Sequence, residues 1–167
     1  LEMLEGAREL IEKRGEPEVA PVTVFISYSH SDAKMVSELL KHLVPLKRLG
    51  LIDDWHDQEI KPGEEWEKKI TSKLSKSDLV LLLISSDFIA SEYCYEKELQ
   101  KALDRHAAKK AIVLPIILRN CLWHELPFGK LQALPKAGKP IATWDNMDEA
   151  MTEVAQGVRE AAKTLRS

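Results

Sequence analysis

Three segments of this sequence concentrate side chains that can bind or transform a ligand. Residues 27–30 place an aromatic ring, which can stack on a planar group, among hydroxyl groups and an imidazole. Residues 56–63 are polar and charged before a Pro-Gly pair, and residues 85–98 end in a short run with two acids, Glu96 and Glu98. A carboxylate beside a reacting centre stabilises positive charge that develops in a transition state. These segments form a site only if the fold brings them together.

Several familiar catalytic motifs are missing from the sequence. It has no G-x-S-x-G elbow, no G-x-G-x-x-G fingerprint and no G-x-x-x-x-G-K-[ST] loop, which disfavours serine hydrolases, dinucleotide-fold oxidoreductases and P-loop enzymes. The five histidines are scattered, and Cys94 and Cys121 lack a C-x-x-C spacing, so we expect no metal site. The adjacent His56 and Asp57 are the one pair that suggests a proton relay.

Length and composition fit one globular domain. The chain has 167 residues, of which 44% are hydrophobic, enough for a single core. Its 24 basic and 27 acidic residues give a net charge of −3, so we expect no nucleic-acid partner. The longest apolar run, residues 79–84, is too short to span a membrane, and we expect no signal peptide. With so few cysteines, we expect a cytoplasmic domain.

The hydrophobic pattern alternates between short strands and amphipathic helices. Residues 79–84 are apolar at every position, as expected for a parallel strand that helices cover on both faces. We expect strands at residues 22–26, 49–55, 79–84, 111–118 and 140–143, and helices at residues 32–46, 64–75, 87–108 and 147–165. This alternation predicts an α/β, flavodoxin-like three-layer fold around a central five-stranded parallel sheet of order 2-1-3-4-5.

In such a sheet, ligands usually bind beyond the carboxyl ends of the strands, where the strand order reverses. For the order 2-1-3-4-5, that point lies between the first and third strands. The three polar segments follow the first, second and third strands, so we expect them to meet there.

The first residues stand apart from this pattern. Residues 1–14 have helical spacing, and residues 15–17, Gly-Glu-Pro, interrupt it. We expect residues 1–20 to be a linker or the end of an upstream helix, and residues 21–167 to form the domain.

Four motifs stand in order on these elements, at residues 25–32, 55–63, 82–99 and 128–135. The first reads Phe-Ile-Ser-Tyr-Ser-His-Ser-Asp, and the second runs from Trp-His-Asp to Ile-Lys-Pro-Gly. They resemble the first box, the BB loop, the third strand with its following helix, and a segment typical of bacterial members of the Toll/interleukin receptor (TIR) domain family.

The resemblance implies a chemical role for one acid. Many bacterial and plant TIR domains cleave NAD+ between nicotinamide and ribose with a glutamate in the helix after the third strand. The family pattern favours Glu98, because Glu98-Leu99 reproduces its ending. Glu96 is the alternative, since helical periodicity places both acids on flanks of the inward face.

The same resemblance implies the other site residues. Tyr28, Ser29, Asp57, Lys61 and Tyr93 are expected to contact NAD+, which is the substrate. No cofactor and no metal are expected.

The implied function is an NAD+ hydrolase of the NAD-cleaving branch that becomes active on self-assembly. We expect an effector domain of an immune, anti-phage protein, with other TIR domains and an upstream sensor or oligomerisation domain as partners. The alternative is a non-enzymatic signalling adaptor that acts through homotypic TIR–TIR interaction.

Overall fold

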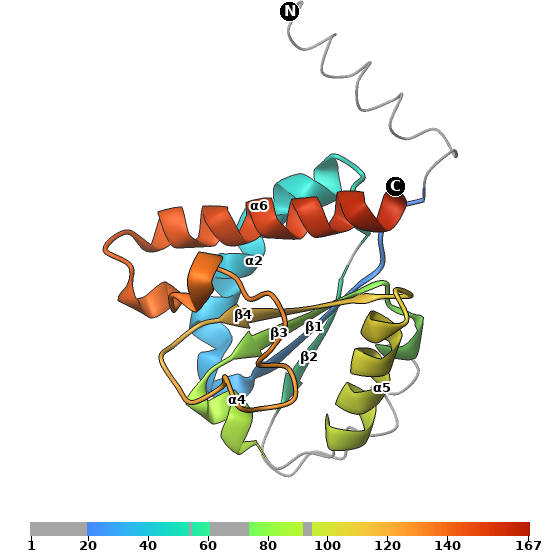
Figure 1. Cartoon of the computed structure of the whole chain (residues 1–167). Coiled ribbons are helices and arrows are strands. Elements are labelled where there is room, and N and C mark those ends of the chain that lie inside the picture. The colour runs from blue at the N-terminus through green and yellow to red at the C-terminus, as the bar shows by residue number, and fades with distance from the viewer. Residues whose placement is uncertain (1–19, 54, 61–73, 92–94) are drawn as a thin grey trace, which may run out of the picture.

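The computed structural model describes residues 20–53, 55–60, 74–91 and 95–167, with the backbone alone at residues 56–60 and 95–98. Helices α2 (Ala33–Arg48) and α6 (Met147–Arg166) cover one face of a parallel sheet. Helices α4 (Ser86–Ala90) and α5 (Tyr95–Ala107) cover the other face (Figure 1). The predicted α/β fold with a parallel sheet between two helical layers is confirmed.

The described sheet has four parallel strands in the order β2-β1-β3-β4. They are β1 (Val24–Ser29), β2 (His56–Ile60), β3 (Leu79–Ile84) and β4 (Ile112–Ile117). The first, third and fourth predicted strands therefore lie within a few residues of their expected positions. β1 lies between β2 and β3, so the strand order reverses where it was expected to.

The second strand was predicted at the wrong residues. Residues 49–55 make only one isolated bridge, between Ile52 and Val22. Residues 56–60, predicted as a polar loop, are the strand that pairs with β1 along its length. The open edge of β1 carries backbone donors and acceptors that need partners, and an outer strand can supply them even when its side chains are polar.

The prediction of a fifth strand at residues 140–143 is contradicted, because Ile141–Thr143 form a 3-10 helix. Leu134 takes the place beside β4 instead: its amide donates to Pro115 O and its carbonyl accepts from Ile117 N, both at 2.8 Å. Proline follows Leu134 directly and therefore cannot donate to a longer strand ladder.

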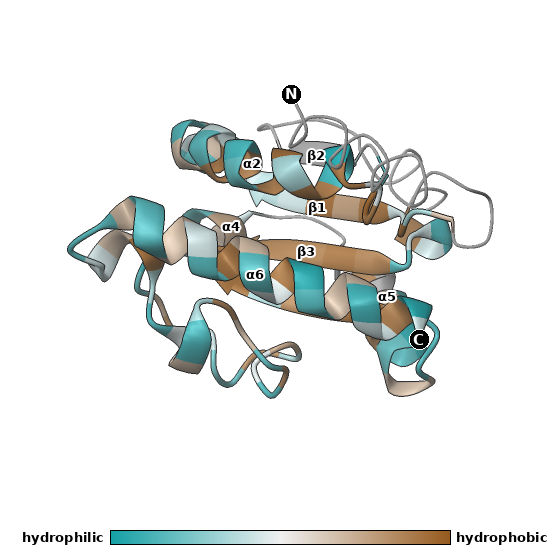
Figure 2. Ribbon diagram, turned by 90° about the horizontal axis from the view of Figure 1, so that it is seen from above, coloured by the Kyte–Doolittle hydropathy of each residue, from teal (hydrophilic) through white to brown (hydrophobic). Residues whose placement is uncertain are grey.

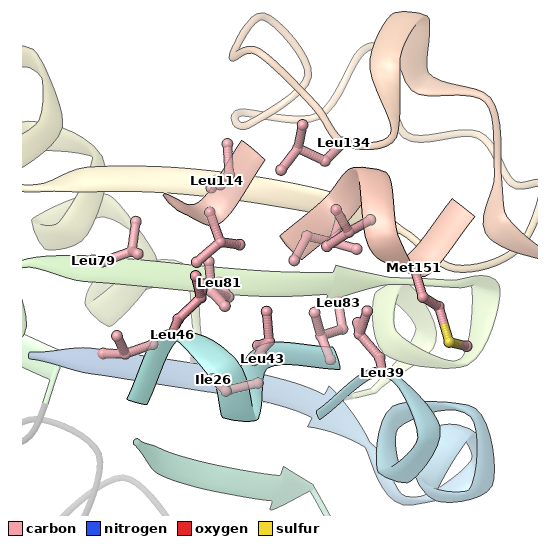
Figure 3. Close-up of a cluster of buried hydrophobic side chains, with 14 of the residues drawn as sticks. Ile26, Leu39, Leu43, Leu46, Leu79, Leu81, Leu83, Leu114, Leu134 and Met151 are labelled. Atoms are coloured by element: carbon pink, nitrogen blue, oxygen red, sulfur yellow. The ribbon is translucent and has the colours of Figure 1, made fainter. Parts of the chain in front are cut away.

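The first core lies between the sheet and helices α2 and α6. Both helices turn an apolar face toward the sheet, with Leu39 and Leu43 of α2 and Val154 and Val158 of α6 fully buried. Figure 3 shows Leu39 and Leu43 with Met151 over the odd-numbered leucines of β3. Burial of this much apolar surface is the main force that holds the two helices on the sheet.

The second core lies on the opposite face. The even-numbered residues of β3 point to it, as strand alternation requires. Phe88 of α4, Leu99 and Ala102 of α5 and Phe128 of the later connection pack against them. Figure 2 shows that β3 is apolar throughout, whereas α2 and α6 mix hydrophilic and hydrophobic residues.

Side-chain caps fix where two helices begin. Ser85 accepts a hydrogen bond from Phe88 N at 3.1 Å and starts α4, and Asn146 accepts one from Glu149 N at 3.2 Å and starts α6. The helix predicted over residues 87–108 is divided into α4 and α5. The helix predicted at residues 64–75 lies outside the described residues except for its end.

The predicted boundary at residue 20 falls at the edge of the described part of the chain, and residues 1–19 lie outside it. Within the ranges that the structure describes, no helix has both the length and the apolar character needed to cross a membrane.

Candidate functional site

Three parts of the chain converge at the carboxyl ends of β1, β3 and β4. β1 runs into a short 3-10 helix, His30–Asp32, whose first turn Ser29 caps by accepting from Ser31 N at 3.3 Å. β3 runs into Ser85 and α4, and β4 runs into the connection that contains Arg119. Because these parallel strands end at one edge, the polar residues after them lie close together.

A buried carboxylate lies at the centre of this edge. The side chain of Asp32 is 3% exposed. Its Oδ1 accepts from Arg119 Nη2 at 2.7 Å, and its Oδ2 accepts from the hydroxyl of Ser85. Ser85 is fully buried and also caps α4, so one hydroxyl joins the Asp32 carboxylate to the start of that helix. Both oxygens of a buried anion are thereby satisfied.

Arg119 connects this carboxylate to a second one. The same Nη2 also donates to Asp87 Oδ2 in α4, so one guanidinium ties together the chain after β1, β3 and β4. We call Asp32, Ser85, Asp87 and Arg119 the strand-end network. It fixes the edge of the sheet at which a ligand would bind.

The two carboxylates keep the guanidinium charged. The hydrogen bond that Arg119 donates to Asp87, together with the charge of Asp32 and the hydrogen bond to it, raises the pKa of Arg119, and partial burial opposes this effect. A base with a raised folded-state pKa contributes stability that is lost only as pH rises through that pKa, far above neutrality. We therefore expect the contribution of Arg119 to stay constant between about pH 5 and 9.

Breaking the network should destabilise the domain. Arg119→Met leaves the buried charge of Asp32 with a hydroxyl alone, and we expect a loss of roughly 1–3 kcal/mol of unfolding free energy. The matched control is Arg159→Met. Arg159 is about as exposed as Arg119, 44% against 40%, but its partner Glu160 is exposed and 3.8 Å away. We expect a change below about 0.5 kcal/mol there. Equal losses in urea titrations would contradict the assigned role of the buried anion.

The sequence prediction missed this network. Asp32 ends the first motif and Asp87 begins the helix expected over residues 87–108, whereas Arg119 belongs to no predicted element or motif. A usable signal was present: each lies within a few residues of the end of a strand, and their charges have opposite sign.

Tyr28 and Ser29 lie at this edge, as predicted. Tyr28 is 7% exposed and belongs to the core under α2, and its side chain borders a surface pocket of about 480 Å³ that Trp55 also lines. Ser29 is 5% exposed, and its hydroxyl is engaged in capping. Their contact with NAD+ stays a prediction.

Of the other residues predicted to contact NAD+, the structure describes the backbone of Asp57 only. Asp57 belongs to strand β2, in register with Ile26, and not to the loop in which it was predicted. Lys61 and Tyr93 lie outside the described residues.

Glu96 and Glu98 lie in the first turn of α5, whose backbone is described there. The last turn of α5 lies beside the first residues of β4, because His106 contacts the amide of Val113. The 13 residues of the helix span about 20 Å, close to the length of a six-residue strand. The first turn of α5 therefore lies toward the carboxyl ends of the strands, which is the edge of the sheet that also carries the strand-end network.

Comparison with known proteins agrees with this architecture. A family model described as TIR domain matches residues 24–153. An uncharacterized protein, y4lF, from Sinorhizobium fredii is 52% identical over 140 residues, which are 84% of this chain and 43% of that protein. The chain thus spans less than half the length of this relative.

A solved structure is also similar. The crystal structure of the TIR domain of the Toll-related receptor TRR-2 from Hydra magnipapillata shares 23% sequence identity with this chain. The likeness covers 66% of this chain and 81% of that one, with a TM-score of 0.46. The family model covers most of the chain and includes all four motifs and the first part of helix α6. This chain therefore belongs to the TIR domain family.

Proposed function

We propose that this TIR domain hydrolyses NAD+ at the bond between nicotinamide and ribose, with Glu98 as the acid that stabilises the reacting sugar. TIR domains include NAD-cleaving enzymes. The observation that supports the proposal is that the first turn of α5, which contains Glu98, lies toward the carboxyl ends of the strands. Open parallel sheets usually bind their ligands at that edge.

The chemistry needs one well-placed anion. When the bond between the ribose carbon and the ring nitrogen breaks, its electron pair leaves with nicotinamide, which departs as a neutral molecule. Positive charge develops on the ribose, and a nearby carboxylate lowers the free energy of that transition state. Water then adds to the ribose carbon and releases one proton, so the products are ADP-ribose, nicotinamide and a proton.

The neighbouring residues hold the dinucleotide in this proposal. Tyr28 and Tyr93 provide aromatic rings, Ser29 a hydroxyl, and Asp57 and Lys61 charges for the ribose and phosphate groups. Arg119 has no such role, because its charge is already matched by Asp32 and Asp87.

The activity is proposed to depend on assembly. TIR domains generally interact with other TIR domains. A relative more than twice as long as the matched segment is consistent with a further domain that clusters the TIR domain. We propose that the whole protein is a cytoplasmic immune effector in which such a domain brings TIR domains together and thereby activates NAD+ cleavage.

The direct test is nicotinamide release. The purified domain is incubated with NAD+ in dilute solution, at high protein concentration and on a clustering support, and products are separated by chromatography. We expect release that rises with clustering. If forced clustering yields none, the enzymatic proposal is wrong, and self-association measured by light scattering in the same samples would then favour the adaptor function.

A further inference from the structure

The last turn of α5 is anchored to the backbone on two sides. Arg105 donates from Nη1 to the carbonyls of Leu74 at 3.2 Å and Ser77 at 2.7 Å, just before β3. The next residue, His106, accepts from the amide of Val113 in β4 at 3.0 Å. Two consecutive side chains thus fix the end of the helix whose first turn carries Glu98.

The outer edge of β4 explains the position of His106. Ile112 N donates to Asp78 O at 2.9 Å and Leu118 N to Ile84 O at 2.8 Å. The backbone amides of the even-numbered residues of β4 therefore point to β3. The backbone nitrogens of residues 113, 115 and 117 therefore face away from β3, toward the outer edge of the sheet.

Every outward position in that strand is accounted for. Residue 115 is proline and has no amide hydrogen, and Ile117 donates to Leu134 O at 2.8 Å. Val113 is left, and the imidazole of His106 supplies its acceptor. An unpaired amide of Val113 at this edge would carry a free-energy cost, and the contact with His106 removes that cost.

This contact requires a neutral imidazole. A backbone amide only donates, so Nδ1 of His106 must carry the lone pair and the ring proton sits on Nε2. A protonated ring carries hydrogen on both nitrogens and cannot accept.

The charged groups around His106 are mixed in sign. His106 lines a surface groove of about 780 Å³ beside β4. The charged residues that line it are Lys130 and Lys136 from the connection after β4 and Glu153, Arg159 and Glu160 from α6. On its own helix, Arg105 is engaged with carbonyls, and Lys109 and Lys110 follow the last turn. No carboxylate hydrogen bond to the ring is present in the described residues, so protonation gains no partner that would replace Val113.

We propose that His106 is a proton-sensitive positioning residue. When neutral, it locks the end of α5 to the edge of β4. When protonated, it releases the Val113 amide and loosens the helix that carries Glu98. We call the hydrogen bond from the Val113 amide to His106 the lock. It belongs to the described fold, and only its effect on catalysis rests on the proposed function.

The lock is tested by amide hydrogen exchange of Val113, followed by NMR as protection factors between about pH 5 and 8. We expect protection of Val113 to fall at least about tenfold toward acid pH, because exchange then no longer requires breaking this bond. The amide of Ile117, bonded to a carbonyl, is the internal control and should not respond.

Two variants make the result specific. In His106→Asn the amide oxygen takes the place of Nδ1 but does not titrate, so Val113 should stay protected at every pH. In His106→Leu it should be unprotected at every pH. Constant protection in the unmodified protein, or an acid-induced loss that persists in His106→Asn, would overturn the lock. Circular dichroism confirms that each variant is folded.

The effect on catalysis is measured separately. In clustered protein we expect kcat for nicotinamide release to fall toward acid pH with little change in KM, and His106→Asn to remove most of that fall. An unchanged acid limb in His106→Asn would contradict the positioning role. A protein that releases no nicotinamide at all contradicts the proposed function instead, and the exchange experiment still decides the lock.

Discussion

Glu98→Gln is expected to lower the rate of nicotinamide release by at least about 100-fold. Glutamine keeps the size and polarity of the side chain but removes the negative charge that stabilises the ribosyl cation. Because that charge acts mainly in the transition state, kcat should fall and KM should change little. Initial rates on a clustering support, at saturating NAD+, measure this effect.

Glu96→Gln is the matched control, since it makes the same chemical change two residues away in the same turn of α5. We expect it to stay within about threefold of the unmodified rate, as for a charge that does not reach the substrate. A large loss in Glu96→Gln alone would transfer the catalytic role to Glu96. Normal rates in both variants would remove the carboxylate from the mechanism.

Gly129→Ala is expected to cost about 3 kcal/mol of unfolding free energy. A Cβ atom at Gly129 would lie 2.0 Å from His124 O and 2.7 Å from Trp123 O, and these are backbone atoms that no side-chain rotation can move away. Phe128 is fully buried beside this glycine, and Trp123 is 5% exposed, so both ends of the turn are held by the core. Relief of the clash therefore requires displacement of packed residues.

The control for Gly129→Ala is Gly50→Ala. Gly50 has a φ of 72°, which disfavours alanine, but a Cβ there would meet no atom within 4 Å. Backbone strain alone should cost about 1 kcal/mol. Urea unfolding of both variants separates the two causes, and similar losses at the two sites would contradict a steric role for Gly129.

The sequence alone determined the layers of the fold. The inward faces of α2 and α6 and the buried strands β1, β3 and β4 follow from hydrophobic spacing, because a helix or a strand buries the same residues whatever packs against it. The carboxyl edge between β1 and β3 follows in turn, since a parallel sheet of this order places its strand ends there.

The two edges of the sheet could not be predicted in the same way. β2 is polar, and the place beside β4 is taken by the single bridge of Leu134, so neither has a clear strand pattern. What forms there depends on which neighbouring backbone groups lack a partner, which is a property of the assembled sheet and not of a local segment.

The polar contacts at the site were decided by the tertiary structure alone. Arg119 reaches Asp32 across 87 positions of the sequence, and His106 meets Val113 because the helix α5 returns along β4. In the sequence these are isolated charged or polar residues, and each of them could equally well be solvated at the protein surface. The apolar pattern fixes where the strands end, but only their packing brings one buried carboxylate to one guanidinium and one imidazole to the last open amide of an edge strand.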